Sequence, residues 1–468
     1  MIHPTEHTPA AEHTPAAQRV PAAQDSPAAQ HSPAAERTLV AQLAEAVGRT
    51  VTVCGWVQTS RLQSVMQFVL VRDHTGTVQV THRRDGGELE AALDGLSTES
   101  AVRITGRVVA NPVVKLGGLE LLPEAVELLG RAEGPLPIDE QSGPEHRSDW
   151  RFLDIRRRPA AQLLFAVQTA FEAGLREYAY AHGCTELHTP KLMGTASESG
   201  AEVFKLGYFG GDAYLAQSPQ FYKQMAIASG IDRVFEIGPV FRAEPSFTSR
   251  HATEFTGVDV ELGWTRDVED VQAFEEGMIA HALGLVAERY GQWIREELGV
   301  EVKVPTTPFP RITMADAQQL LRARGWDPEG AKVDLDPEGE RLLAAHLQEQ
   351  TGHEFVFVTH YPASIRPFYH ARPADRPDLT LSFDLLWKGL EVTTGAQREH
   401  RYEVLTDQAA EKGMSLAPLT DYLNCFRYGC PPHGGFGMGL SRMLMVLLGL
   451  SSIREAVFLF RGPNRLTP

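Results

Sequence analysis

The stretch "HGGFGMGLSRMLMVLLGL", residues 433–450, decides the fold of this chain. Four glycines fall within its first seven residues, and an apolar run of helical length follows them. The stretch has no Gly-Lys-Ser/Thr end, so it is not a P-loop, and its place near the C-terminus argues against a dinucleotide-binding turn. We therefore expect a glycine-rich strand that leads into a buried helix, with Arg442 at the start of that helix.

Other strands are predicted on both sides of this stretch. "RVFEIGPVFRAE" (233–244) and "GVDVELGW" (257–264) alternate like neighbouring antiparallel strands, joined by the polar loop "PSFTSRHATEFT". Amphipathic helices are predicted over residues 159–183 and 267–299. Because strands and helices do not alternate regularly, the pattern favours an α+β fold with an antiparallel sheet. Further strands are predicted in "CTELHTPKL" (184–192), "EFVFVTHYP" (354–362) and "LSFDLLWKGLEVTTG" (381–395).

Residues 38–130 differ from the rest of the chain in their pattern of apolar residues. It holds five short strand-like runs, with a short helix, "ELEAALDGL", between the third and the fourth. This order matches a small Greek-key barrel of the OB type. Such barrels bind single-stranded nucleic acid through a strand face that carries aromatic side chains. Phe68 and Gln79 are candidates for stacking and for reading a base edge, and the barrel pattern alone leaves it equally open that Phe68 belongs to the core.

Two segments of the chain are predicted to lie outside any domain, namely an N-terminal tail and a linker. Five Pro-Ala-Ala hexads lie between His7 and Glu36 and contain almost no large apolar residue, so we expect residues 1–37 to be disordered. Residues 131–150 are rich in Pro, Gly and charge and are predicted to form a linker. The second, larger domain is then expected over residues 151–468.

Composition excludes several classes of protein. The net charge of −16 argues against a nucleic-acid binder that acts by bulk positive charge, although a local basic groove remains compatible with it. No apolar run reaches the roughly 18 residues of a membrane span, and no signal peptide opens the chain. The four cysteines form no Cys-x-x-Cys pair, which favours a reducing, cytoplasmic location. Cys425, Cys430 and His433 fall one ligand short of a structural zinc site.

Three arginines suggest a bound polyphosphate. Arg242, Arg250 and Arg442 stand in stretches that flank the predicted sheet, and the arginine fork suits phosphate oxygens. Glu391 and Thr394 would add oxygen ligands for a magnesium ion between them and the phosphates. The alternative is that each arginine forms a surface ion pair and that Glu391 pairs with one of them.

A second group of polar residues suggests a small ligand with a carboxylate. Gln217, Gln220 and Lys223 lie in "QSPQFYKQ", on a predicted loop that enters a helix. The alternative is an ordinary capped helix start at Ser218-Pro219.

Taken together, these stretches resemble the class II aminoacyl-tRNA synthetases, specifically the aspartyl-tRNA synthetases of the archaeal and eukaryotic type. "HTPKL" is similar to the motif at the family's dimer interface, and "VFRAEPSFTSRHATEFTGVDVEL" (240–262) to its motif 2 strand-loop-strand. "GGFGMGLSR" (434–442) is similar to its motif 3 strand and helix, and the barrel to its anticodon-binding domain. The resemblance covers residues 38–468, and it also rests on "RFLDIR", "QSPQFYKQ", "SFDLLWKGLEVTTGAQREH" and "RLTP".

The resemblance implies a homodimeric enzyme that attaches L-aspartate to tRNA(Asp), and in some members also to tRNA(Asn), through aspartyl-adenylate made from ATP with Mg²⁺. Arg242, Glu391 and Arg442 would be the catalytic residues, and Glu391 and Thr394 would hold the metal. Phe68 and Gln79 would contact the anticodon. The ATP site would comprise Arg242, Ala243, Glu244, Arg250, His251, Ala252, Glu391, Gly439, Leu440, Ser441 and Arg442.

The same resemblance implies how aspartate is chosen. Lys223 and Arg398 would clamp its side-chain carboxylate, so that two positive groups face one negative group. Glu198 would meet the substrate ammonium from a loop that closes over it. Arg242, Gln220 and Thr394 would complete the pocket.

The chain departs from the family pattern in three places. Ser441 stands where the family usually has glutamate before the motif 3 arginine, "FRGPNRLTP" replaces the usual ending, and Ser64 stands where the barrel often has glycine. Two other functions stay open at this point, namely an asparaginyl-tRNA synthetase and a tRNA-binding paralogue without catalysis. Lys223 disfavours the former, and Arg242, Glu391 and Arg442 disfavour the latter. A synthetase-like asparagine synthetase is a more distant alternative, because such relatives lack the barrel.

Overall fold

The computed structural model describes residues 37–195, 203–246, 248–327 and 333–468. The chain divides into two compact units, residues 1–136 and 137–468, so the division falls inside the predicted linker. Within that segment, Pro144–Asp149 form a short helix, α2. Pro144 at its first position has the φ that a helix needs and no N–H to leave unpaired. The predicted tail lies, except for Arg37, outside the described residues.

The first unit is a closed five-stranded barrel in the order β1-β2-β3-β5-β4. Alternating valines such as Val53, Val69, Val78 and Val102 point inward and are fully buried. This alternation of inward and outward residues produces the period-2 pattern in the sequence. The predicted OB-type barrel is thereby confirmed. Its elements are β1 (Thr50–Leu62), β2 (Met66–Asp73), β3 (Gly76–Arg83), α1 (Glu88–Asp94), β4 (Ala101–Ala110) and β5 (Leu119–Gly130), preceded by the 3-10 helix η2 (Val40–Ala46).

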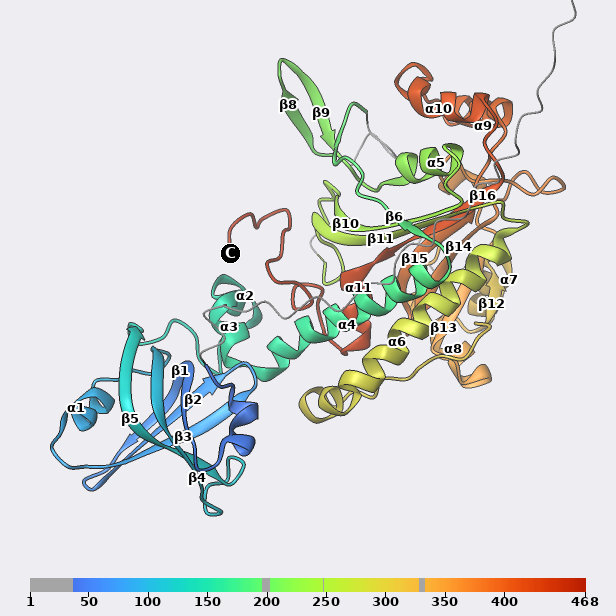
Figure 1. Cartoon of the computed structure of the whole chain (residues 1–468). Helices are drawn as coiled ribbons and strands as arrows, with labels where there is room; N and C mark the ends of the chain where they lie inside the picture. The colour runs from blue at the N-terminus through green and yellow to red at the C-terminus, as the bar shows by residue number, and fades with distance from the viewer. Residues whose placement is uncertain (1–36, 196–202, 247, 328–332) are drawn as a thin grey trace, which may run out of the picture. The chain divides into compact units, whose positions relative to one another are not determined.

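The second unit is built on an eight-stranded sheet in the order β12-β13-β14-β15-β16-β11-β10-β6 (Figure 1). Its central strands β13 to β10 are antiparallel, and β12 and β6 join the edges in parallel. The predicted α+β class is therefore confirmed. The strands are β6 (Thr185–Glu186), β10 (Arg233–Phe241), β11 (Glu254–Gly263), β12 (Arg311–Thr313), β13 (Phe355–Thr359), β14 (Ser382–Trp387), β15 (Leu390–Gln397) and β16 (His433–Gly439).

Two long helices cover one face of this sheet, α4 (Pro159–Ala181) and α6 (Val268–Leu298) (Figure 1). Their apolar stripes pack with Val258, Val260, Phe436 and Met438 in the main core. The helix α11 (Leu440–Leu447) follows β16 directly, as predicted, and its apolar side joins the same core.

The remaining elements surround the sheet. The prediction from "CTELHTPKL" was too long, because β6 ends at Glu186 and a separate short strand begins at Leu192. The other elements are α3 (Arg151–Arg157), β7 (Leu192–Met193), β8 (Lys205–Tyr208), β9 (Gly211–Leu215), α5 (Gln220–Ala228), α7 (Met314–Ala323), α8 (Pro337–Thr351), η3 (Ala363–Ile365), α9 (Tyr402–Glu411), η4 (Ala417–Leu419) and α10 (Thr420–Arg427).

The glycines of β16 are required by close packing. A Cβ on Gly434 would lie 2.7 Å from Val271 of α6, and a Cβ on Gly435 would lie 2.1 Å from the Val260 carbonyl and 2.3 Å from the Glu261 carboxylate. These distances are far below van der Waals contact, so β16 fits between its neighbours only as glycine at both positions. On Gly437, by contrast, a Cβ would come no closer than 3.2 Å to Asp259.

Candidate active site

A cavity of about 280 Å³ lies over the middle of the sheet. Strand register places Asp384 of β14 opposite Thr394 of β15, Thr394 opposite Gly437 of β16, and Gly437 opposite Asp259 of β11. Directly opposed residues share a face of the sheet, so this row lies on one face. Three of the four line the cavity, and Gly437 leaves its middle open.

Most of the residues predicted from the sequence come together here. The predicted residues that line the cavity are Gln220, Arg242, Glu244, Arg250, His251, Ala252, Glu391, Thr394, Arg398, Gly439, Ser441 and Arg442. Lys223, Ala243 and Leu440 do not line it, and Glu198 lies outside the described residues.

At one end of the cavity, Arg442 at the start of α11 meets Glu391 of β15. The Arg442 Nη1 donates to the Glu391 carbonyl at 3.0 Å and lies 3.5 Å from its carboxylate, which also accepts from Thr394 Oγ1 at 3.2 Å. The two side chains are 21% and 37% exposed, so this ion pair is loose and reachable from the cavity. Because the resemblance predicts ATP beside these residues, we call Glu391, Thr394 and Arg442 the nucleotide end.

The loop between β10 and β11 brings further charged groups to this end. Arg250 pairs with Glu340 of α8 at 2.9 Å, and His251 lies 3.3 Å from Glu244. Burial raises the pKa of Glu340 to about 7, with Glu391 acting in the same direction and Arg250 opposing it. The ion-pair alternative thus holds for Arg250 and for Glu391, and both remain at the cavity wall.

The oxygen atoms at the nucleotide end suit a hard divalent cation. The Glu391 carboxylate and Thr394 hydroxyl lie beside Asp384, whose Oδ1 is buried and without a hydrogen-bond partner among the described residues. Its other oxygen pairs with Arg366 at 2.5 Å. Carboxylate and hydroxyl oxygens are the ligands that Mg²⁺ prefers, so the donor set fits this ion. The sequence prediction named Glu391 and Thr394 but not Asp384.

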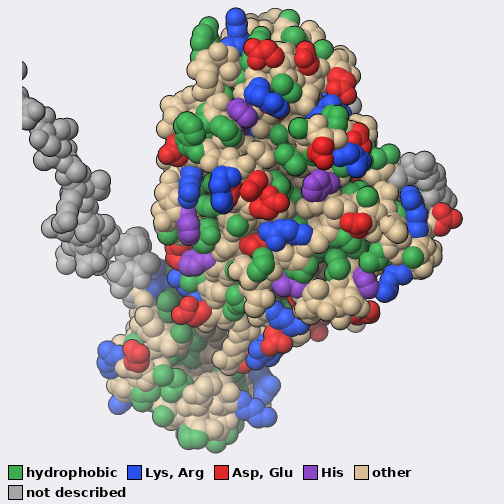
Figure 2. Space-filling view, turned by 90° about the vertical axis from the view of Figure 1, so that its right-hand side faces the viewer, with side chains coloured by type: hydrophobic (Ala, Val, Ile, Leu, Met, Phe, Trp, Pro, Cys, Tyr) green, Lys and Arg blue, Asp and Glu red, His purple; other side chains and the backbone are tan. Residues whose placement is uncertain are grey.

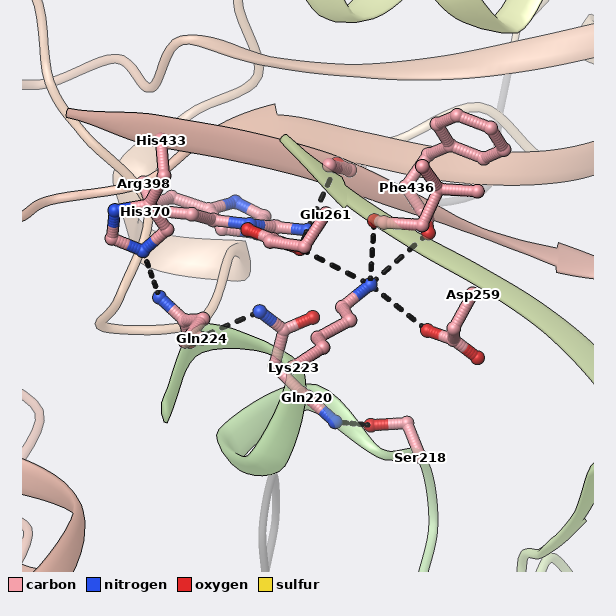
Figure 3. A network of polar contacts seen from close by, with 12 residues as sticks. Ser218, Gln220, Lys223, Gln224, Asp259, Glu261, His370, Arg398, His433 and Phe436 are labelled. Atoms are coloured by element: carbon pink, nitrogen blue, oxygen red, sulfur yellow. Dashed lines mark hydrogen bonds and ion pairs between the residues drawn. The ribbon is translucent and has the colours of Figure 1, made fainter. Parts of the chain in front are cut away.

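The opposite end contains a buried network of charges (Figure 3). Lys223 of α5 donates to Asp259 at 2.9 Å and to the carbonyls of Val260 and Phe436, and lies 3.3 Å from the Glu261 carboxylate. Its ammonium is thus surrounded by acceptors one layer below the cavity wall. Because the resemblance predicts that Lys223 and Arg398 meet the amino acid, we call Lys223, Asp259, Glu261 and Arg398 the amino-acid end.

Arg398, which does line the cavity, lies on the other side of Glu261. It donates from Nε to Glu261 at 2.9 Å, from Nη2 to the Gly435 carbonyl at 2.8 Å and from Nη1 to His370 Nε2 at 3.1 Å. Burial raises the pKa of Glu261, but Arg398 and Lys223 outweigh it and hold the carboxyl ionised. The structure thus adds Asp259 and Glu261 to the two predicted cations, and the clamp on the substrate carboxylate stays a prediction.

A second layer holds this network in place. His370 accepts from Arg398 and is therefore neutral; burial and the charge of Arg398 place its pKa well below the ordinary value. Gln224 bridges Gln220, Tyr422 and the ring of His433, and burial lowers the pKa of His433 to about 4. These contacts fix the side chains that carry the charges.

A carboxyl group reaches the sheet from the helix side. Glu275 of α6 accepts from Thr393 Oγ1 at 2.5 Å and is fully buried, and its second oxygen has no partner among the described residues. Burial raises its pKa to about 8, so it is protonated at neutral pH. Thr393 is the neighbour of the cavity residue Thr394 on β15.

Ser441 is 4% exposed and lies at the wall between this cavity and a neighbouring one. In the barrel, Phe68 and Gln79 lie on the outer faces of β2 and β3, whose inward residues are Val69, Val71, Val78 and Val80. Phe68 is half-buried and outside the barrel core, which removes the core interpretation.

Sequence reasoning missed Asp259 and Glu261, although a signal was present. "GVDVELG" places two acids at alternate positions of a predicted strand, hence on one face. Asp384 and His370 had no comparable signal.

Comparisons with known proteins agree over both compact units. Residues 143–461 match the family model of class II tRNA synthetases (D, K and N), and residues 51–129 match that of an OB-fold nucleic acid binding domain. The chain is 40% identical over 437 residues to an aspartate--tRNA(Asp/Asn) ligase of Aeropyrum pernix, covering 92% of this chain and 98% of that protein. It is 39% identical to an aspartate--tRNA(Asp) ligase of Thermococcus kodakarensis, covering 91% and 97%.

Solved structures show the same relationship. The asparaginyl-tRNA synthetase of Pyrococcus horikoshii complexed with asparaginyl-adenylate superposes with a TM-score of 0.85 at 33% identity, covering 92% of this chain and 100% of that one. The aspartyl-tRNA synthetase of Entamoeba histolytica gives 0.82 at 30% identity, covering 95% and 96%. Within the described residues, no helix has the length and apolar character needed to cross a membrane.

Proposed function

The chain belongs to the class II tRNA synthetases of the D, K and N group, and from this premise we propose that it attaches L-aspartate to tRNA(Asp) in two steps through aspartyl-adenylate. The observation that carries the choice of aspartate is the pair of buried cations, Lys223 and Arg398, around Glu261.

In the first step, the α-carboxylate of aspartate attacks the α-phosphorus of ATP, and pyrophosphate leaves. No general base is required, because a carboxylate is already ionised at neutral pH. Catalysis is then positioning and charge stabilisation. Arg242 meets the α-phosphate and the carboxylate, Arg250 and His251 hold the outer phosphates, and Arg442 meets the γ-phosphate.

The adenine side of the nucleotide is held by the loop that follows β10 and by the start of α11. Glu244 contacts the base, and the neighbouring Ala243 and Ala252 leave room for it. Gly439, Leu440 and Ser441 form the floor beneath it. The support is that all of these except Ala243 and Leu440 line the cavity.

Magnesium is the implied metal, and Glu391 and Thr394 would hold it with Asp384 beside them. When bound, it neutralises phosphate charge and orients the triphosphate. The support in this chain is the oxygen-only donor set and the unpartnered Asp384 Oδ1 among the described residues.

Aspartate is distinguished from asparagine by donor and acceptor matching. The Arg398 guanidinium only donates, so it pairs with a carboxylate oxygen but not with the NH₂ of an amide. Lys223 lies one layer below the cavity wall and contributes the second positive charge of the clamp from behind Asp259 and Glu261, whereas Gln220 lies at the wall itself. An unmatched donor in a buried site costs about 1–3 kcal/mol. The substrate ammonium would be met by Glu198, and Asp259 is a further carboxylate at the cavity wall.

In the second step, aspartate passes to the terminal ribose of tRNA, whose anticodon is recognised by the barrel through Phe68 and Gln79. The support is their shared outward face. We also propose that the chain acts in the cytoplasm as a homodimer through the region around Pro190. We propose in addition that tRNA(Asn) is a second substrate, as it is for the aspartate--tRNA(Asp/Asn) ligase of Aeropyrum pernix.

Charging assays test this function. With purified tRNA(Asp) and tRNA(Asn) in separate reactions, we expect aspartyl-tRNA(Asp) and aspartyl-tRNA(Asn) to form; charging of tRNA(Asp) alone would refute tRNA(Asn) as a second substrate. A protein that charges neither tRNA and supports no aspartate-dependent ATP–pyrophosphate exchange would be a binding paralogue. A protein that charges tRNA(Asn) with asparagine would be an asparaginyl-tRNA synthetase.

A further inference from the structure

A second cavity, also of about 280 Å³, lies between α2, the α3–α4 junction and the turn after α11. It shares no lining residue with the cavity over the sheet. Its wall carries four arginines and two adjacent serines: Arg147, Arg151, Arg158, Arg454, Ser451 and Ser452. All of them belong to the second compact unit.

Positive charge exceeds negative charge around this cavity. Asp154, whose side chain is 1% exposed, accepts from Arg151 at 2.7 Å and from Arg158 at 2.6 and 2.7 Å. One carboxylate therefore serves two guanidinium groups. Burial raises the pKa of Asp154, but Arg158, Arg151 and Arg147 outweigh it and hold the carboxyl ionised. The other acids of the wall, Glu145 and Glu455, leave four arginines against three carboxylates.

The arginines have hydrogen-bonding capacity left. The Nε–H groups of Arg147 and Arg151 are buried and have no partner among the described residues, and Arg151 as a whole is 7% exposed. A buried donor without a partner costs free energy, so a ligand with several acceptor oxygens and negative charge would be stabilised here. A phosphate group has this chemistry.

The cavity is also connected to the loop that holds Arg250. Ile453 N donates to the Ser249 carbonyl at 2.8 Å, and Ser452 Oγ lies 3.5 Å from the same oxygen. The turn that forms one wall of the second cavity therefore supports the residue before Arg250. A phosphate bound at Ser451 and Ser452 would therefore be linked to this loop through the contacts with Ser249.

We propose that this cavity binds a backbone phosphate of the tRNA substrate. The inference rests on the proposed function, since tRNA is the polyanion that this enzyme must hold. The net charge of −16 opposes tRNA binding as a whole, and Figure 2 shows acidic and basic side chains interspersed on the face in view. Binding of a polyanion by such a surface depends on local sites with excess positive charge.

The test uses the full chain and the variant Arg147→Ala, with Arg289→Ala as a matched control that removes the same charge from an exposed position of α6. In Arg147→Ala we expect the KM for tRNA to rise about fivefold. The slope of the logarithm of tRNA affinity against the logarithm of salt concentration should become shallower by about one, the value for one lost phosphate contact. Aspartate-dependent ATP–pyrophosphate exchange, which needs no tRNA, stays at the wild-type rate. Arg147→Lys keeps the charge and loses the fork, so its salt dependence stays that of the wild type while its KM rises less.

The outcomes separate the claims. If exchange is present and Arg147→Ala and Arg289→Ala have the same KM for tRNA and the same salt dependence, the phosphate site is refuted while the proposed function stands. If exchange is absent in the wild-type protein, the proposed function fails first. Inorganic phosphate is compared with chloride at equal ionic strength. A saturable rise in the melting temperature of the wild-type protein with phosphate, together with unchanged tRNA binding in Arg147→Ala, would assign the cavity to a free anion. That result would overturn the tRNA assignment.

Discussion

The two ends of the active-site cavity are built in opposite ways. At the amino-acid end, Lys223, Glu261 and Arg398 are 4%, 0% and 3% exposed and are held by contacts near 3 Å from several strands. At the nucleotide end, Glu391 and Arg442 are 37% and 21% exposed and their charged groups lie 3.5 Å apart. The side chains of the amino-acid end are fixed before any ligand binds. The charged groups of the nucleotide end are accessible, so a ligand can replace their present partners.

This difference has an energetic meaning. A buried ion pair loses several kcal/mol when one partner is removed, because the other charge is left uncompensated. A half-exposed pair contributes about 1 kcal/mol or less and rearranges at small cost. We infer that the amino-acid end provides selectivity through rigidity, whereas the nucleotide end exchanges its internal contacts for phosphate and metal.

The largest effect is expected from Lys223→Ala, which breaks the rigid end. It leaves Asp259 and Glu261 buried without their shared cation, so aspartate activation should fall by about 1000-fold while ATP still binds. Exchange kinetics and ATP titration measure the two properties separately, and a melting curve shows that the variant is folded. Exchange near the wild-type rate would mean that the clamp is assigned to the wrong lysine.

Gly435→Ala breaks the same end through the backbone. The added methyl would lie 2.1 Å from the Val260 carbonyl and 2.3 Å from the Glu261 carboxylate, so we expect a loss of about 3 kcal/mol in the free energy of unfolding. Gly437→Ala is the matched control, because its nearest contact is 3.2 Å, and it should lose less than about 1 kcal/mol. Equal losses in the two variants, measured by denaturant unfolding, would show that the packing argument is wrong.

Arg442→Ala probes the adaptable end. Because its pairing with Glu391 is loose, stability should change little, whereas kcat/KM for ATP should fall about 100-fold through loss of the phosphate contact. Arg289→Ala serves again as the control for removal of one charge. A large drop in melting temperature with normal ATP kinetics would assign Arg442 a structural role instead.

Glu275→Gln tests the carboxyl that supports the nucleotide end from the helix side. Between the ordinary pKa of 4.5 and the raised value of about 8, the folded protein keeps a proton on Glu275 that the unfolded chain has lost. The free energy of unfolding must therefore fall as pH rises through this window. Glutamine does not ionise, so the variant should gain about 3–4 kcal/mol relative to wild type between about pH 5 and about pH 8. A constant difference across this range would show that Glu275 is ionised.

The smallest effect is expected from Ser441→Glu. The native serine already lies in a site whose arginines and Glu391 are in place, so we expect ATP affinity to change by less than about threefold. A gain of tenfold or more in an ATP titration would show that the serine weakens the native site.

Much of this molecule was predictable because its signals are local. The alternating valines of the barrel show which face of each strand is buried. The change from "GGFGMG" to "LSRMLMVLLGL" marks the end of a strand and the start of a helix. Gly435 illustrates the limit, since only strand register shows that its missing side chain makes room for Glu261. The pairing of Lys223 with Asp259 and the place of Asp384 beside Thr394 also depend on strands far apart in the sequence.

The most direct test of the central claim compares aspartate with asparagine in ATP–pyrophosphate exchange by the wild-type protein. A site with Arg398 and Lys223 fixed around Glu261 should activate aspartate and use asparagine with a kcat/KM at least about 100-fold lower. Equal use of the two amino acids, or preference for asparagine, would contradict the account.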